Sequence, residues 1–92
     1  MAGHKGIVYI LQDEVGKFYI GSTTDLNRRL KQHHYHQTRT TARMKKPLLI
    51  FQQEFDSIHK ARVIELKLKK LKRKDYLQKI IRDGYIRLAQ TI

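Results

Sequence analysis

The chain has 92 residues and no cysteine, which leaves room for one domain and excludes disulfides, thiolate metal sites and cysteine nucleophiles. Twenty Lys and Arg stand against eight Asp and Glu, so the net charge is +12. A compact chain with this charge repels itself unless a polyanion binds to it. We therefore expect nucleic acid as the partner, ahead of an anionic membrane or an acidic protein.

The longest apolar run, residues 7–11, is far too short to cross a bilayer, and the N-terminus lacks the apolar stretch of a signal peptide. These features favour a cytoplasmic protein without a membrane partner. We expect a single domain over residues 1–92, with a core at about 5–83.

The first two elements are predicted to be the strands of a hairpin, residues 6–12 and 17–21, because both are rich in Ile, Val and Tyr. A three-residue loop at 14–16, with a left-handed Gly16, pairs Tyr9 with Gly21 and places Tyr9 and Tyr19 on one face. A two-residue loop would put the two tyrosines on opposite faces. We favour the three-residue loop.

A helix is predicted next, capped by Thr23 or Thr24, with Asp25 in its first turn and its end near residue 36. Residues 37–47 are polar and basic and are predicted to form a loop. A third strand is predicted at 48–55.

Two further helices complete the chain. Ser57 is expected to cap a helix that runs to about Leu71, and a last helix over 74–83 should stop at Gly84. The resulting order, β-β-α-β-α-α, predicts a small α/β (α+β) sandwich with a three-stranded antiparallel sheet flanked by helices.

Both longer helices carry polar residues on faces that should meet the sheet. In the first helix, helical spacing places Arg29 and His33 on the face of Leu26 and Leu30. In the second helix, Glu65 falls inside the apolar stripe formed by Ile58, Ala61, Ile64, Leu68 and Leu71. A buried carboxylate is costly unless it is paired or binds a metal. We expect the two helices to aim these polar groups at the sheet that carries the two tyrosines.

Such a set could cleave a phosphodiester. A carboxylate holds a divalent cation that neutralises phosphate charge, an arginine clamps a phosphate oxygen, and a tyrosine or histidine moves the proton of the attacking water. A tyrosine that serves as the base needs a nearby cation to lower its pKa.

The chain resembles the GIY-YIG nuclease superfamily, most closely its compact single-domain bacterial members. The resemblance covers about residues 5–80 and rests on five pieces in order: Gly6-Ile7-Val8-Tyr9, Tyr19-Ile20-Gly21, the stretch from Ser22 to Leu30, His33, and Ala61-Arg62-Val63-Ile64-Glu65. It implies a metal-dependent endonuclease that acts on DNA in preference to RNA, uses Mg²⁺ or Mn²⁺, and serves repair or recombination.

The resemblance also implies a role for each matching residue. Tyr9 matches the general base, and Tyr19 matches its partner at the scissile phosphate. Arg29 matches the phosphate-stabilising arginine, and His33 matches a position where active members often carry histidine. Glu65 matches the single metal-binding glutamate. Gly21 is implied to let the backbone pass close to the helix or the substrate. Some members add a downstream asparagine, for which we find no equivalent.

Simpler interpretations stand beside these roles. The tyrosines suit any strand, Glu65 could pair along its helix with Arg62 or Lys69, and the neighbouring histidines 33, 34 and 36 could form a solvated cluster. Those histidines lack a fourth ligand for zinc.

We expect the nucleic acid to contact the basic residues of the first helix and the following loop, namely Arg28, Arg39, Arg43, Lys45 and Lys46. A protein partner is a further expectation, because the chain lacks the DNA-recognition domain of larger relatives. The competing functions are a non-catalytic nucleic-acid-binding module with the same fold and a small basic ribosome-associated protein. An inward carboxylate at Glu65 disfavours the ribosomal interpretation.

Overall fold

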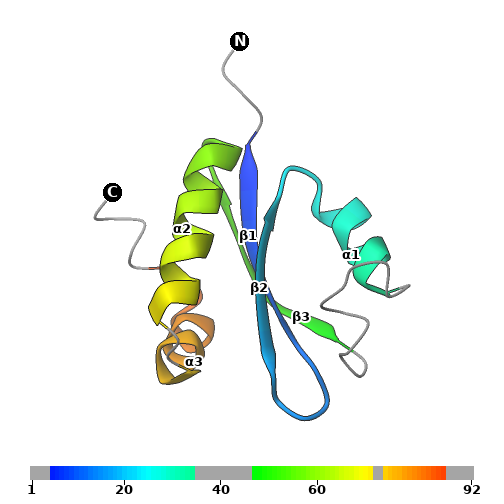
Figure 1. The fold of residues 1–92 in the computed structure, drawn as a ribbon, viewed down its shortest axis with the longest axis vertical. Helices are drawn as coiled ribbons and strands as arrows, with labels where there is room; N and C mark the ends of the chain where they lie inside the picture. The colour runs from blue at the N-terminus through cyan, green and yellow to red at the C-terminus, as the bar shows by residue number, and fades with distance from the viewer. Residues whose placement is uncertain (1–4, 35–46, 72–73, 87–92) are drawn as a thin grey trace.

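The computed structural model describes residues 5–34, 47–71 and 74–86, apart from the side chains of His33 and His34. Within these residues the elements follow the predicted order β-β-α-β-α-α, with all strands antiparallel (Figure 1). The fold is therefore α+β, as predicted. No helix in this described part is long and apolar enough to span a bilayer.

The hairpin has the predicted three-residue loop. Strand β1 (Gly6–Gln12) pairs with β2 (Phe18–Thr23) in a register that sets Tyr9 opposite Gly21. Gly16 has a φ of 88°, and the Asp13 carboxylate accepts hydrogen bonds from the Val15 and Lys17 amides at 3.1 and 2.8 Å. Strand β2 continues two residues beyond the predicted end.

Strand β3 (Leu48–Phe55) has its predicted bounds and pairs with the other side of β1, which gives the strand order β2-β1-β3. The pairing shifts between Ile10, opposite Phe51, and Leu11, opposite Leu49. Ile50 is the extra residue of this irregularity, and it packs with Phe51 against the same core.

The three helices lie close to their predicted places. They are α1 (Leu26–His34), α2 (Ile58–Leu71) and α3 (Lys74–Asp83). The Ser57 hydroxyl caps α2 by accepting from the Lys60 amide at 3.1 Å, and Gly84 ends α3 with a φ of 83°. Helix α1 begins at Leu26, so neither Thr23 nor Thr24 is its cap, contrary to the prediction. Its cap is Asp25, whose carboxylate accepts from the Arg28 amide at 3.1 Å. The predicted end near residue 36 and the loop to residue 46 lie outside the described residues.

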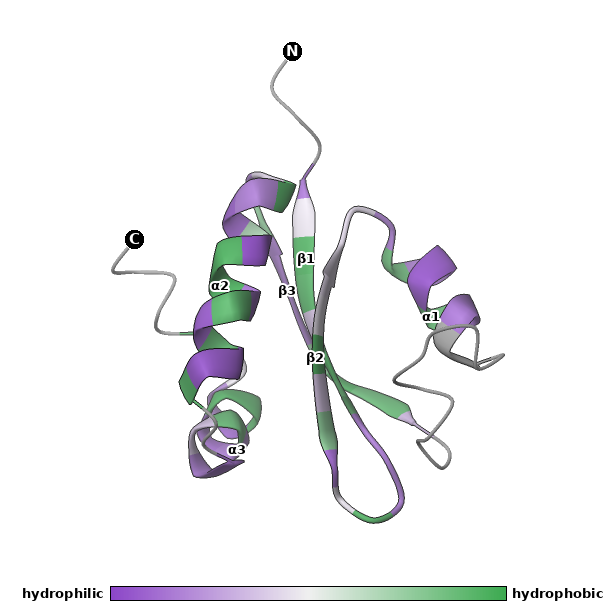
Figure 2. Cartoon of the chain, in the orientation of Figure 1, coloured by the Kyte–Doolittle hydropathy of each residue, from purple (hydrophilic) through white to green (hydrophobic). Residues whose placement is uncertain are grey.

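The helices cover opposite faces of the sheet (Figure 1). Helices α2 and α3 pack on the larger core, which contains Val8, Ile10, Ile20 and Phe51. On the other face, Tyr9 and Leu11 form a smaller cluster with partly buried hydrophobic residues of β2, β3 and α1, namely Tyr19, Leu49, Leu26 and Leu30. In Figure 2 α1 is mostly hydrophilic, whereas hydrophobic and hydrophilic segments alternate along α2.

The apolar stripe of α2 is mostly as predicted. Ala61, Ile64 and Leu68 are buried and Ile58 packs against the core. Leu71 is the exception, because it is 40% exposed at the last turn of the helix. It therefore belongs to the surface rather than to the core.

Candidate functional site

The two tyrosines share the α1 face of the sheet, as the loop length predicted. Tyr9 is fully buried on β1 and Tyr19 is partly buried on β2, with ring centroids 6.2 Å apart and planes tilted by 49°. A Cβ atom on Gly21 would collide with the ring and hydroxyl of Tyr9. Gly21 therefore makes room for the Tyr9 ring; its implied role beside the helix or the substrate stays a prediction.

Arg29 joins this pair from α1. Its side chain is partly buried, and Nη1 donates to Oε1 of Gln32 at 3.0 Å. Its Nε is buried and has no hydrogen-bond partner within the described part of the chain. Arg28 and Arg29 line a polar pocket of about 170 Å³ at the start of the helix, together with Thr23, Thr24, Asp25 and Gln32.

The Tyr9 hydroxyl is held protonated by its surroundings. Burial raises the pKa of Tyr9 to about 12, although a hydrogen bond and the positive charge of Arg29 act to lower it, and Tyr19 adds to the rise. The pKa shift is therefore opposite to the depression that a base at neutral pH requires. With the protein alone, Arg29 is not enough to overcome burial, and a proton-accepting Tyr9 needs further positive charge beside it.

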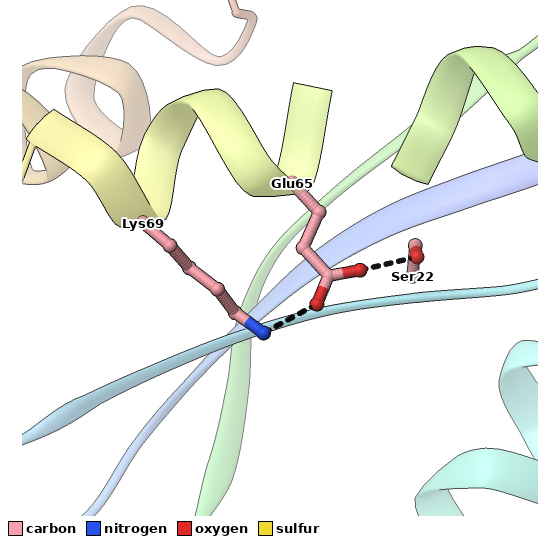
Figure 3. Close-up of polar contacts among 3 residues, drawn as sticks. All are labelled: Ser22, Glu65 and Lys69. Carbon is pink, nitrogen blue, oxygen red and sulfur yellow. Dashed lines mark hydrogen bonds and ion pairs between the residues drawn. The ribbon is translucent and has the colours of Figure 1, made fainter. Parts of the chain in front are cut away.

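Glu65 approaches from the other layer. Its side chain extends from α2 to the edge strand β2 and is 17% exposed. Ser22 donates a hydrogen bond to Oε1, and the Lys69 ammonium lies 2.5 Å from Oε2 (Figure 3). The ion pair with Lys69 that was expected as the simpler interpretation is thus present. The same ammonium lies 5.9 Å from the centroid of the Tyr19 ring.

The tyrosines with Arg29 and the Glu65 carboxylate lie on opposite faces of the sheet rather than on one face. We expected both helices to aim at the face that carries the tyrosines, but α1 and α2 cover opposite faces. Side chains alternate along β2, so Tyr19 lies on the α1 side whereas Ser22 contacts Glu65 of α2. Lys69 connects the two sides, because its ammonium contacts Glu65 and lies over Tyr19.

Most of the remaining predicted site residues lie outside the described part of the chain. His33 lies in α1, but its side chain is outside the described residues. Arg28 is exposed. Arg39, Arg43, Lys45 and Lys46 are also outside the described residues, so the predicted basic loop is not placed.

Glu65 and Ser22 form a small set of hard oxygen donors. Among the described residues, no three His, Cys, Asp or Glu side chains form a cluster that could enclose a metal ion. One carboxylate with a neighbouring hydroxyl nevertheless suits Mg²⁺ or Mn²⁺, because such ions commonly take one or two protein oxygens and fill their other positions with water and phosphate oxygens. The residues present therefore fit a divalent ion that is shared with a substrate.

Two residues that contact Glu65 were not predicted as site residues. Ser22 was given no role, and Lys69 was considered only as an ordinary helical partner of Glu65. One signal was available for Ser22, since it lies two residues after Ile20 and therefore on the face that meets α2. A hydroxyl at that position, opposite a helix with one inward carboxylate, is a natural hydrogen-bond donor.

The sequence matches a known domain family and bacterial relatives. The model of the GIY-YIG catalytic domain matches residues 5–80. A UPF0213 protein of Streptococcus pneumoniae serotype 4 is 39% identical over 71 residues, which cover 76% of this chain and 72% of the relative. The UPF0213 protein spr1390 of S. pneumoniae strain R6 is 38% identical over the same shares.

A solved structure is similar over nearly its whole length. The solution NMR structure of the UPF0213 protein BH0048 from Bacillus halodurans has a TM-score of 0.55 and 30% identity, and the match covers 95% of this chain and 94% of that one. The family match spans both tyrosine strands, Arg29 and Glu65. The chain therefore belongs to the GIY-YIG family and has its nuclease fold.

Proposed function

We propose that this protein is a divalent-metal-dependent endonuclease that hydrolyses phosphodiester bonds in DNA. The observation that carries the proposal is that Tyr19, which clusters with Tyr9 and Arg29, and Ser22, which donates a hydrogen bond to Glu65, lie three residues apart on β2 with their side chains on opposite faces of the sheet. A chain of this fold and a net charge of +12 attracts a polyanion, which supports nucleic acid as the substrate.

The proposed roles follow from the surroundings of each side chain. Arg29 carries a permanent charge beside a polar pocket and would bind a non-bridging phosphate oxygen. Tyr9 would hold the proton-transfer position next to it, with Tyr19 as its hydrogen-bond neighbour. His33 is proposed to contact the phosphate from the same helix.

Glu65, with the Ser22 hydroxyl beside it, would hold Mg²⁺ or Mn²⁺. When bound, the ion supplies Lewis-acid stabilisation of the phosphate charge. Lys69 already places a positive charge on Glu65. If Glu65 held the ion, the Lys69 ammonium would lose this ion pair and would be available to neutralise part of a phosphate charge.

The second candidate is a non-catalytic nucleic-acid-binding module with the same fold. Two observations favour it: the Lys69 ammonium satisfies Glu65 without a metal, and the pKa of Tyr9 is about 12, which keeps its hydroxyl protonated. This module would bind DNA through its positive charge and leave it intact.

A cleavage assay separates the two functions. The wild-type protein and Glu65→Gln are incubated with labelled single-stranded, duplex, flap and four-way-junction DNA and with RNA, in Mg²⁺, Mn²⁺ or EDTA. We expect metal-dependent cutting by the wild type and a loss of at least about 100-fold in Glu65→Gln, because several kcal/mol of charge stabilisation disappear. DNA affinity should stay equal or rise slightly, since a negative charge is removed.

Glu54→Gln is the matched control. Glu54 is exposed and its ion pair within the described residues is with Lys5 at 3.5 Å, so this variant removes the same charge without touching Glu65 or its partners Ser22 and Lys69 and should cut like the wild type. Equal metal-dependent cutting by all three proteins would contradict the role of Glu65. Salt-sensitive binding without cutting by any of them would establish the binding module instead.

A further inference from the structure

A second basic surface lies next to the candidate site, on the α2 side of the sheet. It is a groove of about 390 Å³ between the start of β2 and the corner where α2 leads to α3. We call it the lysine groove, after Lys17, Lys69 and Lys74 on its rim. None of these lysines except Lys69 entered the proposed reaction.

The groove combines positive charge with an apolar floor. Ile20, Leu68 and Leu77 of the floor are buried, and the partly buried Phe18 has the Lys74 ammonium 5.6 Å from its ring centroid. None of the described residues that line it is a carboxylate. Within the described part of the chain, Lys17 and Lys74 have no carboxylate partner, so both charges are available to a ligand.

The groove is continuous with the candidate site. Lys69 lines the groove and at the same time contacts Glu65 and lies over the Tyr19 ring. Phe18 and Ile20 of the groove flank Tyr19 on β2, whose outer edge pairs with no other described strand. A DNA strand that lies across Glu65 and follows β2 toward the hairpin loop therefore enters the lysine groove.

We propose that the lysine groove binds the single-stranded DNA segment next to the phosphate that is cut, an inference that rests on the proposed function. The lysines match the phosphates in charge, and the apolar floor matches base faces, which only unpaired nucleotides expose. The volume is in the range of sites for small ligands, so it takes one or a few nucleotides and not a duplex. The groove selects substrates with an unpaired strand at the cut.

The test measures binding without cleavage. Fluorescence anisotropy in EDTA gives the affinity for a labelled 12-nucleotide oligo-dT and for a 12-base-pair duplex across a salt series. In Lys17→Gln/Lys74→Gln we expect single-strand affinity to fall by about tenfold and the salt slope to fall by about 1.4, which is about 0.7 for each lost phosphate contact. Duplex affinity should change less than about twofold, because the groove does not hold it.

Lys67→Gln/Lys70→Gln is the matched control, because both lysines are exposed on α2 outside the groove and the charge change is the same. It should leave the single-strand salt slope unchanged. Equal losses in the two double variants, or equal losses for single strand and duplex, would overturn the proposal. Because no metal or cutting is involved, a wild type that cleaves nothing refutes the nuclease function while this comparison still decides whether the groove binds single strands.

Discussion

Tyr9 shows how one buried side chain limits the chemistry of the site. Its hydroxyl is enclosed by the hairpin and α1, and burial outweighs the attraction of Arg29 for a tyrosinate, so its pKa is about 12 instead of 10.0. The group is therefore a hydrogen-bond donor at neutral pH. It becomes a proton acceptor only when a cation or a protonated neighbour adds positive charge.

This difference in pKa predicts late ionisation of one tyrosine. The chain has five tyrosines, and in a tyrosinate absorbance titration the wild type should show one component above pH 11 that Tyr9→Phe lacks. Because burial favours the neutral hydroxyl in the folded state, the folded protein keeps this contribution to its stability below pH 10 and loses it as the pH rises toward 12. The free energy involved is about 3 kcal/mol, at 1.36 kcal/mol per pKa unit.

The wild type should therefore lose more unfolding free energy than Tyr9→Phe between pH 9 and 12, measured by denaturant titration. Tyr19→Phe serves as the comparison, since Tyr19 is only partly buried and its removal should leave the late component in place. A titration in which Tyr9→Phe and the wild type coincide would show that the ring is more accessible than its burial indicates.

Single residues were predictable where local rules determine them. The three-residue loop and strand alternation place Tyr9 and Tyr19 on one face, and the helical period turns Glu65 inward. The Ser22–Glu65 hydrogen bond joins residues 43 positions apart, so no local pattern specifies it. The pKa of Tyr9 likewise depends on how completely α1 covers the ring, which periodicity does not measure.

At the scale of elements, Gly6 allows α2 to pack close to β1 and so positions Glu65. A Cβ atom on Gly6 would lie 2.5 Å from the Ile58 Cα and 2.8 Å from the Ser57 carbonyl oxygen. Both obstacles are backbone atoms at the start of α2, so they yield only if the helix moves. Gly6→Ala should therefore cost near the upper end of about 1–3 kcal/mol of unfolding free energy and weaken the Glu65–Ser22 contact.

Denaturant unfolding measures the stability loss, and metal-dependent cutting reports the displacement of Glu65. Gly84→Asn is the control, because Gly84 has a φ of 83° with open space around it and asparagine tolerates that conformation at a helix end. It should cost less than about 1 kcal/mol. If Gly6→Ala were as stable as the wild type, the close approach of α2 to β1 would be wrong.

The elements themselves were largely predictable, since caps, turn residues and periodicity agree with one another. The arrangement of the layers was not. The pattern of α1 shows that one face packs, but the choice of sheet face depends on the path of the chain after β2. The shift in the β1–β3 pairing at Ile50 was also missed, because an apolar run such as residues 48–51 has no alternation that would reveal an extra residue.

For the molecule as a whole, charge and function are linked. The charge of +12 comes in part from three basic regions. They are the polar pocket with Arg28 and Arg29 at α1, the lysine groove at α2 and α3, and the basic stretch at residues 39–46. Few carboxylates compensate, and one of them, Glu65, is used at the candidate site. The fold therefore tolerates self-repulsion that a bound polyanion relieves.

This balance predicts opposite responses to salt. From 20 to 300 mM NaCl the thermal midpoint of the free protein should rise, because screening weakens self-repulsion; a gain of about 1 kcal/mol corresponds to about 4–8 °C for a domain of this size. Over the same range DNA affinity should fall steeply, because the release of counterions on binding becomes less favourable as the salt concentration rises. Differential scanning fluorimetry follows the thermal midpoint, and fluorescence anisotropy follows the DNA affinity. A thermal midpoint that does not change with salt would mean that the basic groups are too far apart to repel one another. The excess charge would then require no polyanion to offset it.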